Sequence, residues 1–288
     1  MPVTDRQLAG FRRDHESTIL HSTSPRHLAG PGDARHVTHA LLAAGWTITS
    51  DPASPETEVT SPDLQARLQA APQFAPSRNW WRLTVEPSNS RSWYASFTQK
   101  VPAEILAGLT DTLLTPAPAD APDPWDLFRS TGWSVTQSEN GTGFEARSPD
   151  QRAVAEYSRP FPDETYSTFS WRIRTREYPA DAAESAFDGR SVWNGWLDGH
   201  TPAQAIAGLV AALTNREPLL RGWGQHGWHY DVQHERTSRT GTDVADAHQQ
   251  RLKNVQAQVR AARRRQRLDT VPASTPVGTV ISPAARTR

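Results

Sequence analysis

Hydrophobic residues recur along this chain with helical spacing in some segments and with strand-like alternation in others. A helix is predicted from about residue 34 to 44, with Asp33 as its N-cap and Gly45 as its C-terminal stop. The residues that share its apolar face are Val37, Ala40, Leu41 and Ala44.

Alternating segments follow this helix, and their order predicts an antiparallel meander. They are TITSD, a segment that ends at the turn Ser61-Pro62-Asp63, LQARLQ, WWRLTVE and WYASF. A further helix begins at Pro102, and its buried stripe is Ile105, Leu106, Leu109 and Leu113. The predicted unit is therefore a helix, four or five strands and a helix. Its helices would cover one sheet face and leave the other open or paired with a partner.

The same unit occurs a second time. Gly45-Trp46 recurs as Gly132-Trp133, Trp81-Arg82 recurs as Trp171-Arg172, and the motif P-A-x-x-x-A-G-L at 102–109 recurs at 202–209. Because an internal repeat determines the whole architecture, we predict an α+β fold of two tandem repeats with a helical basic tail. The expected divisions are an N-terminal arm (1–32), a first repeat (33–114), a Pro/Ala linker (115–123), a second repeat (124–218) and a C-terminal segment (219–288) that holds an aromatic and histidine-rich stretch, a basic helix and a disordered end.

The landmarks of both repeats also carry a family resemblance. Together, HLAGPGDARHVTHALLAAGW, VPAEILAGL, DPWDLF and TPAQAIAGL resemble the tandem domain-of-unknown-function family DUF three-one-seven, which is common in Streptomyces and other actinobacteria. The resemblance covers about residues 25 to 215. It implies an actinobacterial, cytoplasmic setting and no particular activity, because the function of the family is uncharacterised.

Strand alternation divides the large side chains between the two sheet faces. Trp81 and Trp171 fall in the inward, apolar sets. The outward set mixes arginine with aromatic residues, namely Arg82, Tyr94, Arg172, Arg174, Arg176 and Trp196. Rings flanked by arginines stack bases and hold phosphates in single-strand nucleic-acid binders. The alternative is that the two repeats, or two copies of the chain, pack sheet face to sheet face and bury Trp80, Tyr94 and Trp196.

The C-terminal segment has a helical pattern beyond Asp243. The residues of its apolar seam are Leu252, Val255, Val259 and Ala262. Their spacing resembles that of a short coiled coil, which would allow homo-oligomers through the tail helix. No acidic residue occurs from Arg251 to Arg267. The candidates to contact nucleic acid or an acidic protein are Arg260, Arg263, Arg264 and Arg265. Alternatively, the helix is a solvated extension, and these arginines stabilise its C-terminal end by complementing the helix dipole.

Composition narrows the remaining choices. The 31 basic and 31 acidic residues cancel, so no overall field directs the chain to DNA or to an anionic membrane. There is no cysteine and no run of about 20 apolar residues, which excludes thiolate chemistry and predicts no membrane span. His36 with His39, and His226 with His229, lack a third ligand at a recognised spacing. No metal or other cofactor is therefore predicted.

Catalytic motifs such as G-x-S-x-G or a phosphate loop are also missing from the sequence. The leading hypothesis is a cytoplasmic, non-catalytic macromolecule-binding protein, with single-stranded nucleic acid as the first candidate ligand. A structural or protein-interaction scaffold of two packed repeats is the alternative. An enzyme is the third hypothesis, because acid–base pairs can assemble from residues distant in sequence.

Overall fold

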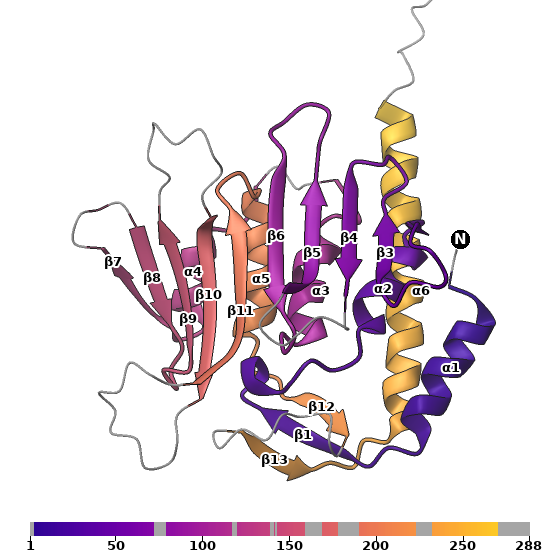
Figure 1. Ribbon diagram of the computed structural model, residues 1–288, viewed down its shortest axis with the longest axis horizontal. Helices are drawn as coiled ribbons and strands as arrows, with labels where there is room; N and C mark the ends of the chain where they lie inside the picture. Colours follow the sequence, from indigo (N-terminus) through magenta and orange to yellow (C-terminus); the bar gives the residue numbers. More distant parts are fainter. Residues whose placement is uncertain are drawn as a thin grey trace, which may run out of the picture.

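The computed structural model describes residues 3–71, 79–116, 120–138, 141, 143–158, 169–177, 190–222 and 232–269. Within these residues the predicted mixture of helices and antiparallel sheets is confirmed, and a long helix follows the last strand (Figure 1). The aromatic and histidine-rich stretch at 223–230, part of the Pro/Ala linker and the chain after residue 269 lie outside the described residues.

The two halves of the molecule contain helices and strands in the same order. In the first half these are α2 (Arg35–Ala43), β2 (Thr47–Ile48), β3 (Thr57–Thr60), β4 (Ala66–Ala70), β5 (Asn79–Val85), β6 (Trp93–Thr98) and α3 (Ala103–Asp111). In the second half they are α4 (Pro124–Ser130), β7 (Ser134–Gln137), β8 (Gly143–Arg147), β9 (Ala153–Ser158), β10 (Phe169–Glu177), β11 (Arg190–Asp198) and α5 (Ala203–Thr214).

These strands form one antiparallel sheet in the order β2-β3-β4-β5-β6-β11-β10-β9-β8-β7. The halves meet edge to edge, because β6 pairs with β11 through Phe97↔Gly195, Ser96↔Trp196 and Ala95↔Leu197. The alternative of two repeats packed sheet face to sheet face within the chain is therefore wrong. The last strand of one half is hydrogen-bonded to the last strand of the other half, so both faces of the joined sheet are continuous.

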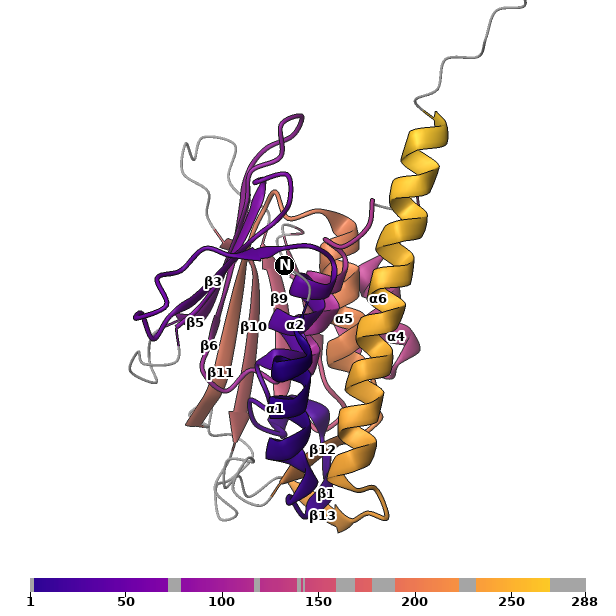
Figure 2. The same ribbon diagram turned by 90° about the vertical axis from the view of Figure 1, so that its right-hand side faces the viewer.

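The helices α2, α3, α4 and α5 lie on one face of this sheet, and Figure 2 shows that no described helix lies on the other. At the centre of the helical layer, α3 and α5 contact each other closely at their glycines. A β-carbon at Gly108 would lie 2.5 Å from the carbonyl oxygen of Gly208, and a β-carbon at Gly208 would meet the Gly108 carbonyl in return. The repeated A-G-L motif therefore has a physical reason, since only glycine permits this approach.

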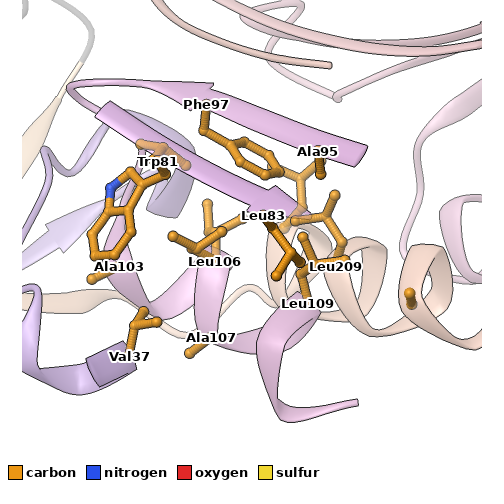
Figure 3. Close-up of a cluster of buried hydrophobic side chains, with 14 of the residues drawn as sticks. Val37, Trp81, Leu83, Ala95, Phe97, Ala103, Leu106, Ala107, Leu109 and Leu209 are labelled. Carbon is orange, nitrogen blue, oxygen red and sulfur yellow. The ribbon is translucent and has the colours of Figure 1, made fainter. Parts of the chain in front are cut away.

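The hydrophobic core lies between the sheet and these helices (Figure 3). Trp81 and Leu83 of β5 pack with Leu106 of α3, and all three side chains are buried. The inward tryptophan of the second half, Trp171, is also buried, at 8% exposed. The inward assignment of both tryptophans is confirmed.

The terminal segments add a third layer. Its elements are α1 (Asp5–Glu16), β1 (Leu20–Ser24), the 3-10 helix η1 (Arg26–Leu28), β12 (Leu219–Gly222), β13 (Gln233–Arg236) and α6 (Gly241–Asp269). The strands form a small sheet in the order β12-β1-β13. The helix α6 lies along α1 and α2 (Figures 1 and 2), and Arg12 of α1 forms an ion pair with Asp246 of α6.

The start of α2 differs slightly from the sequence prediction. The N-cap position is Ala34, which offers no side-chain cap. Asp33 nevertheless accepts a hydrogen bond from the backbone N–H of Arg35 at 2.8 Å and from the Arg35 guanidinium. The carboxylate thus satisfies one of the free N–H groups of the first turn from one position further out than predicted.

Candidate functional site

The outward sheet face carries a row of side chains across the four central strands. In the strand register Arg82 of β5 pairs with Ser96 of β6, Ser96 pairs with Trp196 of β11, and Trp196 pairs with Arg172 of β10. We call these four residues the central row. Since cross-strand pairs on one face lie side by side, the register alone brings three of the predicted outward residues together.

The central row is nearly symmetric about the junction of the two halves. Ser96 and Trp196 are one hundred positions apart in the sequence, occupy matching places in the two repeats and pair directly with each other. Arg82 and Arg172 flank this pair from matching strands. The symmetry is broken at its centre, where one half contributes a serine and the other a large indole.

The predicted outward residues differ in exposure and in charge neutralisation. Arg172 is exposed and has no carboxylate partner in the described part of the chain, whereas Arg174 is half-buried and ion-paired with Glu156 of β9. The remaining outward residues, Arg82, Tyr94, Arg176 and Trp196, are half-buried. The face is therefore a mixed surface with local positive charge at its centre rather than a uniformly basic one.

The tail helix does not continue this face. Its seam residues Leu252, Val255 and Val259 are buried at 4%, 5% and 7% exposure and belong to the main core. The chain buries these three residues against its own helices, so in this structure they are not available to form a coiled coil with another copy. Figure 2 also places α6 on the helical side of the molecule, opposite the outward sheet face.

The predicted tail arginines therefore form a separate surface. Arg263 donates a hydrogen bond to the carbonyl oxygen of Ala44 at 3.4 Å, at the C-terminal end of α2, and Arg260 contacts the Gln256 carbonyl within its own helix. Arg264 and Arg265 are exposed. One short ligand cannot contact these residues and the central row together, because the sheet and the helical layer lie between them (Figure 2).

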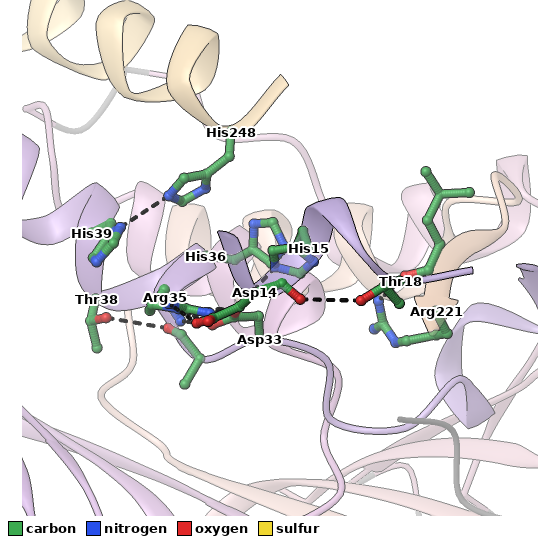
Figure 4. Close-up of polar contacts among 12 residues, drawn as sticks. Asp14, His15, Thr18, Asp33, Arg35, His36, Thr38, His39, Arg221 and His248 are labelled. Atoms are coloured by element: carbon green, nitrogen blue, oxygen red, sulfur yellow. Dashed lines mark hydrogen bonds and ion pairs between the residues drawn. The ribbon is translucent and has the colours of Figure 1, made fainter. Parts of the chain in front are cut away.

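A second group of polar side chains, of which the sequence singled out only Asp33, His36 and His39, lies where α1, α2, α3, α6 and β12 meet (Figure 4). Arg221 of β12 is 2% exposed and forms two hydrogen bonds of 2.7 Å with the carboxylate of Glu104 on α3. Arg221 also donates to the carbonyl oxygen of Ala29. Burial would raise the pKa of Glu104, but the charge and hydrogen bonds of Arg221 outweigh it and lower that pKa to about 2.

Histidines make up the rest of this group. His39 Nδ1 lies 3.1 Å from His248 Nε2 in a buried contact between α2 and α6, and His248 stacks on Phe11 of α1. Burial lowers the pKa of His39 to about 4 and that of His248 to about 3. Both rings are therefore neutral near pH 7, which allows one nitrogen to donate and the other to accept.

His15 and His36 complete the group. His15 contacts Asp33, with Nε2 3.1 Å from Oδ2. Burial would raise the pKa of Asp33, but the hydrogen bonds from His15 and Arg35 outweigh it and hold that pKa well below its usual range. His36 lies 4.0 Å from Glu104, and burial lowers its pKa. Among the described residues no three histidine or acidic side chains are arranged to hold a metal ion.

Fold and surface together define a class: a mixed α+β protein with two repeats joined through one sheet. Residues 60–119 and 147–219 match the model of a family described as SPDY, domain of unknown function (DUF317). The family resemblance seen in the sequence is thereby confirmed for two segments of the chain, which begin at residue 60 rather than 25 and end at residue 219. No curated protein and no solved structure matches the chain. Within the described residues, no helix is both long and apolar enough to span a membrane.

Proposed function

We propose that the outward sheet face binds single-stranded nucleic acid, with Trp196 as a stacking platform and with Arg82 and Arg172 as phosphate contacts on either side. The observation that carries this proposal is the register of the central row, which places an indole between two arginines on a face that no described helix covers. Base stacking on an aromatic ring contributes about 1–3 kcal/mol and needs no particular sequence.

The local charge supports this assignment. The central row itself contains no carboxylate, and the neighbouring glutamate, Glu156 on β9, already pairs with Arg174. Further from the centre, Glu58 pairs with Arg67 and Glu145 with Arg147. Positive charge is therefore left in the middle of the face, where Arg172 is exposed.

The dimensions also suit a single strand. Neighbouring strands lie about 4.8 Å apart, so the backbones at Arg82 and Arg172, three strand spacings from each other, are about 14 Å apart. A ligand that runs across the row would place one base on Trp196 and a phosphate toward each arginine. A duplex is disfavoured, because its bases are stacked inside and a flat sheet offers no helix to insert into the major groove.

The test is fluorescence anisotropy of a labelled single-stranded oligonucleotide titrated with the full chain at several salt concentrations. Trp196→Ala should weaken binding by about 5- to 150-fold, the equivalent of the stacking energy. The double variant Arg82→Gln/Arg172→Gln should also reduce the slope of log affinity against log salt by about 1.4, since each phosphate contact contributes about 0.7.

Two control variants bear on the location of the site. Arg129→Gln removes a basic side chain on α4, on the helical side, and should leave the affinity unchanged. Arg264→Gln/Arg265→Gln removes exposed tail arginines and should leave it unchanged for a short oligonucleotide. If the control variants weaken binding as much as Trp196→Ala does, or if wild type does not bind at low salt, the proposal is wrong.

A scaffold that uses the same face would give a different result. In that case Trp196→Ala would shift the sedimentation coefficient of the free protein toward a smaller species while no oligonucleotide bound. Sedimentation velocity of wild type and Trp196→Ala, run beside the anisotropy titration, therefore distinguishes nucleic-acid binding from self-association through the sheet face.

A further inference from the structure

A cleft of about 380 Å³ lies where the second repeat meets the N-terminal segment, and none of the central row residues lines it. The loop after α4, the turn between β8 and β9, the end of α5, the segment around η1 and the first residue of β13 form its walls. The side chains that matter chemically are Arg26, His27, Trp133, Asp150, Arg216 and Gln233.

Two arginines line this cleft, and neither forms an ion pair within the described structure. The Nε of Arg26 donates to the carbonyl oxygen of Glu217 at 3.2 Å, and Nη2 of Arg216 donates to the carbonyl oxygen of Thr131 at 2.7 Å. Arg26 is half-buried, and burial lowers its pKa although Glu104 and Glu217 act in the opposite direction. The hydrogen bonds of both guanidinium groups go to neutral carbonyl oxygens, and a partly buried guanidinium favours an anion within hydrogen-bond distance.

The acidic group in the cleft is already matched. Asp150 Oδ2 lies 3.1 Å from Nε2 of the buried His27, and its Oδ1 accepts a hydrogen bond from Ser148. Burial raises the pKa of Asp150, but His27 and Ser148 outweigh it and lower that pKa to about 2. Asp150 therefore has contacts of its own within the protein, and neither arginine of the cleft forms an ion pair with it in the described structure.

In the first repeat, the position that corresponds to this cleft is covered by the tail helix. At its corresponding helix end, a β-carbon on Gly45 would lie 3.2 Å from Nη2 of Arg263 on α6 and 3.7 Å from Pro62. The tail helix thus closes this position in the first repeat. At Gly132 of the second repeat the neighbouring arginine is Arg216, two residues after the end of α5, and the cleft opens beside it.

We propose that this cleft binds the oxyanion of a small molecule, a phosphate ester or a carboxylate, through Arg26 and Arg216. Trp133, which packs edge-on to His27 with ring centroids 6.4 Å apart, gives the cleft an apolar wall for the remainder of the ligand. The volume suits a metabolite-sized compound, since ligand pockets typically measure about 300–1,000 Å³.

Isothermal titration calorimetry of the full chain with adenosine monophosphate, adenosine, inorganic phosphate and succinate tests this site. Adenosine monophosphate or succinate should give saturable binding, and the difference between them identifies the phosphate or the carboxylate as the favoured group. Adenosine, which lacks an anion, should not bind. Arg26→Gln and Arg216→Gln should each weaken binding by about tenfold or more, because a hydrogen bond to a charged group contributes about 1.5–3 kcal/mol.

Three further variants test whether the binding measured by calorimetry takes place in this cleft. Arg129→Gln on α4 is the matched control and should bind as wild type does. Gln233→Glu adds a negative charge at an exposed position of the wall and should abolish binding while the structural contacts of both arginines remain. Arg172→Gln should leave this affinity intact even if it weakens oligonucleotide binding. Absence of saturable heat with every anion, or unchanged affinity in Gln233→Glu, would overturn the proposal.

Discussion

The two repeats share a core and differ in what covers their first helix. In the first repeat α2 buries five residues, Val37, His39, Ala40, Leu41 and Leu42, and packs against both α3 and the tail helix α6. In the second repeat the corresponding helix, α4, buries Pro124 and Phe128 and exposes Asp126 and Arg129. The terminal helices responsible for this difference lie outside the two segments that match the family model. The matched segments supply the central strands β4–β6 and β9–β11 and the closing helices α3 and α5, and the terminal segments make one half unlike the other.

The largest expected effect concerns the buried pair beside the first repeat. Arg221→Met leaves the Glu104 carboxylate without its partner, and we expect the free energy of unfolding to fall by about 3–5 kcal/mol in urea denaturation. The double variant Glu104→Gln/Arg221→Met should recover much of this loss, because both charges are then gone. A loss below about 1 kcal/mol in the single variant would show that the terminal segments contribute little to the stability of the first repeat.

The histidine contact between α2 and α6 predicts a pH dependence for the same half. The pKa values of His39 and His248 are lowered from 6.5 to about 4 and about 3 in the folded chain. The unfolded chain therefore binds more protons below about pH 6.5, and stability falls as the pH falls. Between pH 7 and pH 5 the loss is about 2 kcal/mol for each histidine.

Urea midpoints measured from pH 7.5 to pH 5 check this prediction. The variant His39→Gln/His248→Gln should show a flatter profile than wild type over this range. Equal slopes for the two proteins would contradict the assignment of neutral, buried rings. At lower pH, protonation of Asp33 and Glu104, whose pKa values are also lowered, removes further stability in both proteins.

The smallest effect compares the two arginines at the helix ends. Arg216→Gln removes a 2.7 Å hydrogen bond to the Thr131 carbonyl after α4 and should cost about 1 kcal/mol. Arg263→Gln removes a 3.4 Å hydrogen bond from an exposed side chain to Ala44 and should cost less than about 0.5 kcal/mol. Urea denaturation of both variants measures this order, and the reverse order would mean that the tail helix, rather than the second repeat, depends on its arginine.

Local pattern predicted the strands and their faces well, for a physical reason. Side chains alternate strictly along a strand, so the apolar set that includes Trp81 and Leu83 determines which face carries Arg82. The same holds for Trp171 and Arg172, whose burial and exposure agree with the alternation. The repeated glycines at 108 and 208 were visible as a motif, but their role depends on the contact between two helices.

The remaining features depend on contacts between distant segments. Nothing in WYASF indicates that β6 would pair with β11 rather than form a free edge, because backbone hydrogen bonding is the same for either neighbour. Arg221 and Glu104 lie in unrelated segments with no common spacing, so their pairing left no local signal. The apolar seam of the tail helix was recognised, but sequence alone does not distinguish a contact with the same chain from one with a second copy.

The pairing of Ser96 with Trp196 has a consequence for how such a chain can change. In a homodimer, a residue on the two-fold axis always faces its own copy, so a tryptophan there would have to accommodate a second tryptophan. When the two halves are encoded in one chain, the residues at the two matching positions can be substituted independently of each other. This protein uses that freedom at the junction, where a serine leaves room for the indole opposite it.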